Sequence, residues 1–480
     1  MTKKIFYCLV GGILTAISFN YPQFSFLIVI SLVPLIDILG SNGRTALLGS
    51  LSFSLIGYGL IIFWLNYVVV LGYIALLLYL SFYCCFFCFF GRYFYRKPLA
   101  IVSLPAFWVL IEFLRESIWC GFGWASLGYS QFKNLYLIQS ADILGVKFIS
   151  FLIVLINFCV YQLLFKRRKP VLHFSLIALV FGFSFLYSVY KINKPYEVRK
   201  MRAAISQPNI DQELKWEPGY QQEIITRLKD AVEKSGPGLL IFPEAAWPVI
   251  IGESSQTGFD EFLESANKDI LIGVVAQEQE CFYNQALLSL SGGANRQIYR
   301  KINLVPFGEY IPLRKYLGFI DIVNEIGDMA AGSEAVSFFY QDFKFFVLIC
   351  FEDTFADFVS GVARNNDFLI NITNDAWFKG EPQASQHLSI MVFRAIENRI
   401  SIIRSANTGV SAVVSFLGKI DSLKNKGKEN FISGLKEITV EINQKRSFYS
   451  KYPHLLEVGS CFFILGLLIF SNLNSRRLRK

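Results

Sequence analysis

The chain has 480 residues, enough for more than one domain. Charged residues make up 17% of it and hydrophobic residues 53%, whereas about a quarter of a typical soluble protein is charged. The apolar residues gather in 1–190 and 453–473, and 197–447 has the mixed composition of a soluble domain. The formal net charge of +9 is carried largely beside apolar runs, which favours membrane orientation over nucleic-acid binding.

The cysteines do not indicate a disulfide framework. Of the nine, two fall in the soluble part, Cys281 and Cys350, and no Cys-x-x-Cys pair stands near further His or Cys at metal-ligand spacing. Six of the other seven lie inside apolar runs: Cys8, Cys84, Cys85, Cys88, Cys159 and Cys461.

Eight stretches are long and apolar enough to predict membrane-spanning helices, each of which needs about 20 residues. The predicted spans are roughly 4–21, 24–40, 45–66, 72–90, 98–114, 144–165, 171–190 and 453–473. The first span lacks a small-residue cleavage site and is followed by further spans, so we do not expect it to be removed as a signal peptide.

Basic residues occupy every second connection between these spans. They are Lys3 and Lys4, Arg44, Arg92 with Arg96 and Lys97, the run 166–169, and the tail with Arg476, Arg477, Arg479 and Lys480. The positive-inside rule then places both termini in the cytoplasm and 197–447 on the opposite face. The basic residues of 191–202 conflict with this orientation, but they begin a large translocated domain and are outweighed by the agreeing basic segments.

The long connection 115–143 is rich in Trp, Tyr and Gly, including the run Trp119 to Trp124. Two interpretations stay open for it: anchoring at the membrane–water interface, which Trp and Tyr favour, or lining a path for lipid entry.

The soluble part alternates strand and helix patterns, which predicts a layered α/β domain. Predicted strands are 201–210, 238–242, 269–276, 283–290, 368–373 and 402–405, and predicted helices are 221–234, 259–267, 354–365 and 386–399.

One cysteine of this part lies where α/β folds expose reactive side chains. Cys350 ends the apolar run Phe-Val-Leu-Ile, which reads as a buried strand, and a helix pattern follows. Considered alone, Cys350 could also be a buried residue that only packs in the hydrophobic core.

Two further charged residues follow predicted strands. Glu244 stands between Leu-Leu-Ile-Phe-Pro and Ala-Ala-Trp-Pro, a setting that suits a partly desolvated general base, a helix cap or a structural ion pair. Lys301 precedes a Pro/Gly turn that returns Glu309 eight residues later. It is either an exposed surface charge or a cation that stabilises an oxyanion and a thiolate.

Taken together, these stretches resemble the nitrilase superfamily, whose members use a Glu, a Lys and a Cys at strand ends in that chain order. The resemblance extends to Asn374 to Phe378, Gln386-His387, Arg394 to Glu397 and Asn407-Thr408-Gly409. With seven spans before the domain and one after it, the whole chain resembles the membrane-embedded branch of that superfamily, the bacterial apolipoprotein N-acyltransferases.

The resemblance implies an αββα sandwich on an eight-helix membrane base, divided into 1–196, 197–447 and 448–480. It implies Glu244 as base, Lys301 as oxyanion-stabilising cation and Cys350 as nucleophile. Glu309, Glu352 and Trp216 are implied as supporting residues. One departure concerns the family's Gly directly after the Asn-Asp-Ala-Trp-Phe run, because here Lys379 comes first and Gly380 second.

The implied reaction is acyl transfer at the outer face of a bacterial inner membrane, without metal or organic cofactor. A membrane phospholipid donates an acyl chain to Cys350, and the N-terminal amine of a diacylated apolipoprotein accepts it. Two rivals are a membrane-tethered amidase that passes the acyl group to water and a polytopic receptor or transporter without catalysis. The intact Glu–Lys–Cys set argues against the second rival.

The apolar stretch 313–332 follows Glu309 and contains glycines near its end. It predicts either a buried amphipathic helix or a lid at the bilayer surface that admits acyl chains.

Overall fold

The computed structural model describes residues 1–118, 121–166, 169–252, 256–293, 295–312, 314, 328–379 and 381–477. The chain forms two compact units, residues 1–194 with 447–480 and residues 195–446. The run 119–120 of the predicted interfacial connection lies outside the described residues, as does Gly380. Of the predicted lid, only Arg314 and 328–332 are described.

The first unit is helical, because its apolar runs carry few residues that break or cap a helix. Its long helices are α1 (Thr2–Asn20), α4 (Gly43–Ile61), α5 (Val70–Tyr95), α6 (Ala100–Ser117), α9 (Val146–Tyr161), α10 (Pro170–Asn193) and α18 (Leu455–Arg477). Short helices are η1 (Pro22–Leu27), α2 (Ile28–Ser31), α3 (Val33–Ile38), η2 (Phe63–Tyr67), η3 (Leu127–Gln131), α7 (Leu135–Ile138), α8 (Ala141–Leu144), η4 (Gln162–Lys166) and α17 (Phe448–Lys451).

Five helical segments among the described residues are long and apolar enough to cross a membrane. They are Thr2–Asn20, Gly43–Ile61, Val70–Tyr95, Val146–Lys166 and Pro170–Asn193. The second predicted span is broken into the short helices η1, α2 and α3, and α6 carries Glu112, Arg115 and Glu116 in its last two turns. The count of eight spans therefore stays a prediction.

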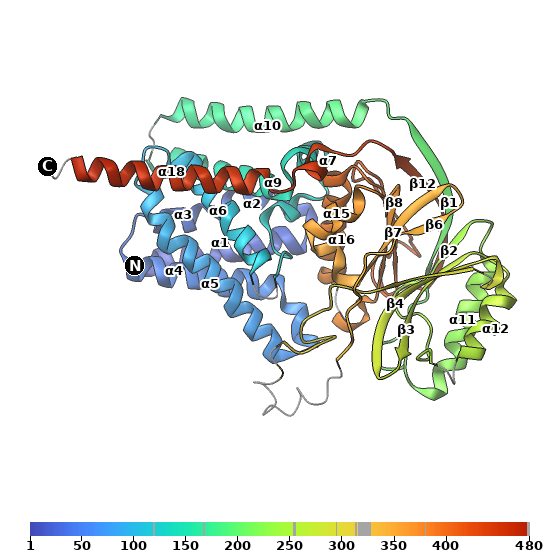
Figure 1. Cartoon of the computed structure of the whole chain (residues 1–480). Coiled ribbons are helices and arrows are strands. Elements are labelled where there is room, and N and C mark those ends of the chain that lie inside the picture. The colour runs from blue at the N-terminus through green and yellow to red at the C-terminus, as the bar shows by residue number, and fades with distance from the viewer. Residues whose placement is uncertain are drawn as a thin grey trace. The chain divides into compact units, whose positions relative to one another are not determined.

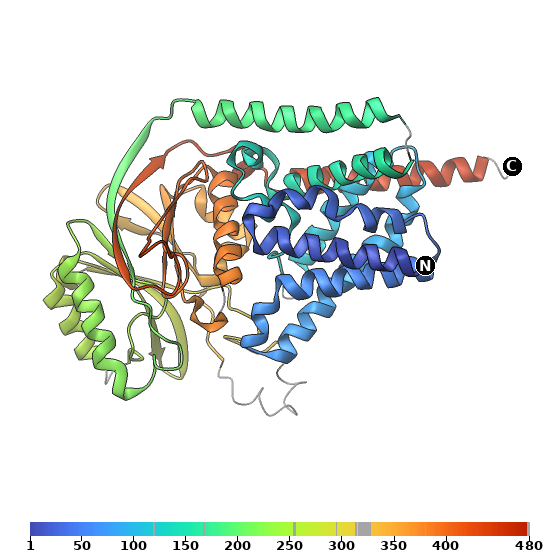
Figure 2. The same cartoon turned by 180° about the vertical axis from the view of Figure 1, so that it is seen from behind.

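Close packing and buried charge hold this unit together. α1 packs on α4, where a Cβ added at Gly12 would lie 2.4 Å from the Phe53 carbonyl oxygen, so that only glycine lets the backbones approach. Lys147 of α9 is buried and pairs with Glu116 at 2.6 Å and with Glu457 of α18 at 3.3 Å. Figure 2 shows α1 beside α4 in this bundle.

The second unit contains two six-stranded sheets (Figure 1). The first has the order β12-β1-β2-β3-β4-β5 and the second the order β11-β10-β9-β8-β7-β6. The strands of the first are β12 (Gly434–Asn443), β1 (Val198–Gln207), β2 (Leu239–Ile241), β3 (Ile270–Glu278), β4 (Cys281–Leu290) and β5 (Asn295–Arg300). Those of the second are β11 (Ile420–Ser422), β10 (Ala412–Val414), β9 (Ile402–Ala406), β8 (Phe368–Thr373), β7 (Phe343–Ile349) and β6 (Phe338–Tyr340).

Both sheets are built alike. Three parallel strands, β1-β2-β3 in one and β7-β8-β9 in the other, are flanked by antiparallel strands. The parallel strands β2, β7 and β8 are largely apolar and buried, as expected where both faces are covered. Because parallel strands end at the same edge, side chains that follow them gather there.

The two sheets pack face to face. The hydroxyl of Ser405 on β9 donates to the carbonyl oxygens of Ser206 and Ile241 in the other sheet, at 2.9 and 3.2 Å. The rings of Tyr299 and Phe346 pack edge to face with centroids 4.8 Å apart.

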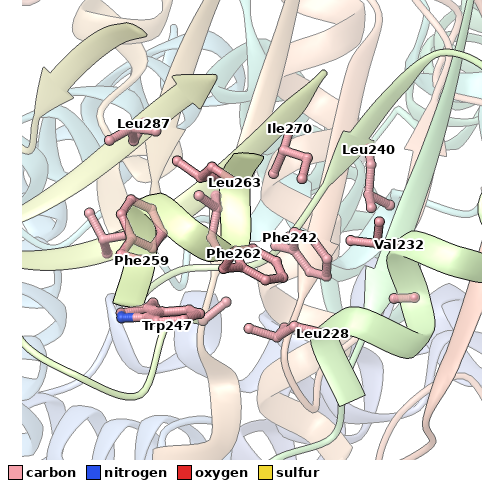
Figure 3. Close-up of a cluster of buried hydrophobic side chains, with 14 of the residues drawn as sticks. Leu228, Val232, Leu240, Phe242, Trp247, Phe259, Phe262, Leu263, Ile270 and Leu287 are labelled. Carbon is pink, nitrogen blue, oxygen red and sulfur yellow. The ribbon is translucent and has the colours of Figure 1, made fainter. Parts of the chain in front are cut away.

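Helices α11 (Gln221–Lys234) and α12 (Gln256–Ala266) cover the outer face of the first sheet through an apolar core (Figure 3). Leu228 of α11 and Phe262 of α12 contribute to this core with Leu240, Ile270 and Leu287 of the strands. Helices α15 (Ala356–Ala363) and α16 (Glu381–Asn398) lie beside the second sheet. The layered α/β domain predicted from the sequence is therefore confirmed, with two sheets between helical layers.

Candidate active site

The three predicted catalytic residues each follow a strand. Glu244 stands three residues beyond β2, Lys301 directly follows β5 and Cys350 directly follows β7. Gly273 of β3 makes room for the turn at Glu244, because a Cβ there would lie 2.5 Å from the Ala245 nitrogen and 2.6 Å from the Glu244 Cα.

Lys301 lies between two carboxylates. Its side chain is 1% exposed, and Nζ is 2.8 Å from Oε2 of Glu309 and 3.7 Å from Oε1 of Glu244. Burial alone would lower the pKa of Lys301, but the charges of Glu309 and Glu244 raise it overall. Lys301 is therefore a permanent cation, which excludes the exposed surface charge considered from the sequence.

Glu244 is oriented by two donors. Asn284 Nδ2 donates to Oε1 at 2.7 Å, and the backbone N–H of Asn374 donates to Oε2 at 2.8 Å. The same Asn284 amide also donates to Glu309 Oε1 at 3.0 Å. Asn284 of β4 thus links both carboxylates that contact Lys301.

Cys350 occupies a strained turn. Its φ of 53° lies in the left-handed region that non-glycine residues seldom adopt, and it opens the 3₁₀ turn η7 (Cys350–Thr354). Asn371 Nδ2 donates to the Cys350 carbonyl oxygen at 3.0 Å, and Arg404 donates to Asn371 Oδ1 at 2.8 Å. These bonds stabilise the backbone of the turn.

The thiol of Cys350 is a poor acid before substrate binds. Burial and then the charge of Glu244 raise its pKa well above the ordinary value, against the opposing charge of Lys301. Because the thiolate is the nucleophilic form, this thiol needs a base. The charges that act on it are those of Glu244, Lys301 and Asp375.

Glu352 holds backbone segments of the site together. It is fully buried, and its Oε1 accepts from the Tyr299 hydroxyl at 2.8 Å and from the N–H groups of Ile302 and Asn303 at 3.0 and 3.1 Å. Its Oε2 accepts from the Ile349 N–H at 2.8 Å. Burial raises the pKa of Glu352 despite these donors. The carboxylate joins the segment after Lys301 to the turn at Cys350.

In the described part of the chain, Trp216 does not contact the three predicted catalytic residues. It is 40% exposed, and its ring centroid is 5.7 Å from Nζ of Lys215. Within the described residues, no hydrogen bond or ring contact joins Trp216 to Glu244, Lys301 or Cys350.

Lys379, the residue at which the sequence departs from the resemblance, has a glycine-like backbone. Its φ is 42° and its ψ 20°, in the left-handed region. Its Nζ donates to Glu213 Oε1 at 2.6 Å, which ties the end of η8 (Asp375–Phe378) to the loop before Trp216.

A second buried charge network lies behind Cys350. His387 Nε2 contacts Asp353 at 2.9 Å, its Nδ1 contacts Asp375 at 3.2 Å, and Arg404 pairs with Asp375 at 2.9 Å. Burial alone would raise the pKa of Asp375, but Arg404 and the hydrogen bond from His387 hold it far below its ordinary value. In the part of the chain that is described, no group of three or more His, Cys, Asp or Glu residues is placed to hold a metal ion.

Sequence reasoning missed three residues: Asn284 and Arg404, which contact the site, and Lys215, a buried lysine on which the charge of Glu244 acts. Asn284 is one of several polar residues on a strand, and Arg404 is a charge inside an apolar strand, which is itself a signal of a buried ion pair. Lys215 stands in a polar loop, where a lysine carries no signal.

The site lies in a domain of the carbon-nitrogen hydrolase class. Residues 202–434 match the carbon-nitrogen hydrolase family, and residues 11–159 match the apolipoprotein N-acyltransferase N-terminal domain. An apolipoprotein N-acyltransferase of Geobacter metallireducens is 31% identical over 97% of this chain and 94% of its own length. One of Haemophilus ducreyi is 29% identical over 89% of this chain and 88% of its own. XC1258 from Xanthomonas campestris, a CN-hydrolase superfamily protein of known structure, is 17% identical with a TM-score of 0.38 over 54% of this chain and 97% of its own.

The chain therefore belongs to the apolipoprotein N-acyltransferase family, as the resemblance in its sequence predicted.

Proposed function

We propose that the protein is an N-acyltransferase of lipoprotein maturation. It moves an acyl chain from a membrane phospholipid, through a thioester on Cys350, to the N-terminal amine of diacylglyceryl-cysteine in apolipoproteins. Family membership supports this function over the amidase that releases the acyl group to water. The observation that carries the assignment of roles is the placement of Lys301 within 3.7 Å of Glu244, with the charges of both acting on the Cys350 thiol.

In the first half-reaction Glu244 accepts the thiol proton, and the Cys350 sulfur attacks the ester carbonyl of the phospholipid. The charge of Lys301 stabilises the oxyanion that forms, and Glu309 keeps Lys301 in place through its 2.8 Å ion pair. The C–O bond then breaks, and the proton passes from Glu244 to the lysophospholipid oxygen that leaves.

In the second half-reaction the neutral amine of the acceptor attacks the thioester carbonyl. A C–N bond forms and the C–S bond breaks. Glu244 takes a proton from the attacking nitrogen, and Cys350 regains its proton. A thioester divides one difficult step into two easier ones, and the ester-to-amide exchange is downhill.

The contacts of Glu352 and the exposure of Trp216 suggest what these two supporting residues do. We assign Glu352 to positioning the Cys350 turn, and Trp216, with its exposed ring, to contact with substrate.

The proposal includes the membrane arrangement. Eight spans in 1–196 and 448–480 hold a catalytic domain, 197–447, on the periplasmic side of a bacterial inner membrane. The alternation of basic connections supports this orientation, and the five apolar helices support the membrane location.

Mass spectrometry of the purified full-length protein tests the central claim. Incubation with phospholipid alone is expected to add one acyl chain to the peptide that contains Cys350, and a diacylated lipopeptide should then remove it as an amide. Cys350→Ala should give neither adduct nor product. Cys281→Ala, an exposed cysteine at the start of β4, is the matched control and should behave as the unaltered protein. Full transfer by Cys350→Ala, or release of the chain as free fatty acid in the presence of acceptor, would contradict the proposal.

A further inference from the structure

A second lysine lies near Glu244, and it lacks the partners that Lys301 has. Lys215 is 2% exposed. Within the described residues its Nζ makes no hydrogen bond and no ion pair, and it lies over the Trp216 ring, 5.7 Å from the centroid. A buried ammonium group without a counter-ion is unfavourable by several kcal/mol, so an anion from outside the chain that reached this amine would stabilise its charged form.

The loop that carries Lys215 is held to the site by polar contacts. Ile210 exchanges hydrogen bonds of 2.8 Å in both directions with the side chain of Asn407. Gln212 Oε1 accepts from Asn374 Nδ2 at 2.6 Å, and it is the backbone N–H of this same Asn374 that binds Glu244. Glu213 is tied down by Lys379. The Lys215 amine is therefore presented from an anchored loop.

The two lysines of this region differ in how their charge is balanced by carboxylates. Lys301 contacts both Glu309 and Glu244, so its charge is shared by two carboxylates. The charge of Glu244 acts to raise the pKa of Lys215, although the two side chains form no ion pair. Burial lowers the pKa of Lys215 to about 8, so the amine is still mostly charged at neutral pH.

We propose that Lys215 binds the phosphate of the phospholipid that donates the acyl chain, and so makes the site prefer phosphate-bearing donors. This inference rests on the proposed function. The buried amine would gain from the phosphate the partner that the chain does not supply, and lysine binds phosphate as a point charge through its three donors. The phosphate fixes the lipid backbone, and thereby the ester, relative to Cys350.

The test compares two donors with the same acyl chains, phosphatidylethanolamine and the neutral diacylglycerol, in detergent micelles. The rate of adduct formation on Cys350 is measured without acceptor. The unaltered protein should react faster with phosphatidylethanolamine. In Lys215→Met that rate should fall about tenfold to a hundredfold, the loss expected for one charged hydrogen bond, while the rate with diacylglycerol changes little. The half-saturating phosphatidylethanolamine concentration should rise in the same variant.

Two variants sharpen the result. Lys215→Arg keeps a cation and should retain most of the preference for the phosphate-bearing donor. Lys229→Met, which removes an exposed lysine from α11, should change neither rate.

Other outcomes would overturn the inference. Equal losses with both donors would make Lys215 a structural residue. Unchanged adduct formation with slow aminolysis of the thioester, in Lys215→Met and Lys215→Arg alike, would make Lys215 a proton acceptor for the incoming amine. No adduct from any donor in the unaltered protein would overturn the proposed function itself, and this inference with it.

Discussion

The backbone N–H of Asn374 donates to Oε2 of Glu244 at 2.8 Å, and this bond joins the two sheets at the site. Asn374 follows β8 of one sheet, whereas Glu244 follows β2 of the other. The side chain of Asn374 binds Gln212 and Asn407, so one residue orients the proposed base and anchors the loop of Lys215. The position of Glu244 and the position of the loop that carries Lys215 therefore both depend on how the two sheets stack.

Asn284→Leu should slow catalysis without unfolding the protein. The change removes the donor shared by Glu244 and Glu309, and each charged hydrogen bond contributes about 1.5–3 kcal/mol, so we expect the rate of adduct formation to fall about tenfold or more. Thermal unfolding should show a folded protein. A normal rate would mean that the Asn374 bond alone orients Glu244.

Lys301→Met should lower both activity and stability, because it leaves Glu244 and Glu309 as buried carboxylates without their cation. Breaking such a pair costs about 3–5 kcal/mol, visible as a lower unfolding temperature. Adding Glu309→Gln to Lys301→Met removes one stranded charge and should restore part of the stability but none of the acyl transfer. Recovery of activity in the double variant would contradict a catalytic role for the Lys301 charge.

The two readouts at Cys350 should move in opposite directions in Glu244→Gln. Acyl transfer should fall by about a hundredfold to ten-thousandfold, the usual contribution of a general base. The negative charge of Glu244 raises the pKa of the Cys350 thiol, so its removal should lower that pKa and increase the thiolate present near pH 8. Alkylation of Cys350 by iodoacetamide, followed by mass spectrometry with exposed Cys281 as internal reference, should therefore become faster. Slower alkylation would show that Glu244 also assists this attack.

The Asp375–His387–Arg404 network should make stability depend on pH on both sides. The pKa of Asp375 is lowered, so its contribution is present above the ordinary aspartate value of about 4 and is lost as the pH falls through its folded pKa. The pKa of His387 is raised, mainly by Asp353 and Asp375 against burial and Arg404, so its contribution is present below its ordinary value of about 6.5 and is lost as the pH rises through the folded pKa. Unfolding temperatures should therefore peak between these limits, and His387→Gln should flatten the alkaline side. An unchanged alkaline side would mean that His387 is neutral in the folded protein.

Reporter fusions test the orientation in the membrane. Alkaline phosphatase needs disulfides formed outside the cytoplasm, so a fusion after Asn430 should be active and a fusion after Lys97 inactive. Both should be expressed at similar levels. The reverse pattern would place 197–447 in the cytoplasm and contradict the proposed role.

Local patterns in the sequence determined much of this protein. Local patterns predicted helix 221–234 and strand 368–373 with the bounds that the structure has, because the helix carries an apolar face and the strand is a short run buried on both faces. The chain order of Glu244, Lys301 and Cys350 indicated the nitrilase superfamily, and the apolar spans on either side of the domain indicated its membrane-embedded branch. Hydropathy predicted the membrane character, although a count of spans by composition is sensitive to charged residues such as those of α6.

The tertiary structure alone decided which polar groups meet. Asn284 and Glu244 are 40 residues apart, and Asn374 and Glu244 are 130 apart, so their bonds depend on strand order and on how the sheets stack. Burial is likewise a property of the packed fold: it places Lys215, which reads as an ordinary loop lysine, without an ion-pair partner among the described residues. Local periodicity reports which face of an element is apolar, whereas the charge environment of a side chain is set by distant segments that only folding brings together.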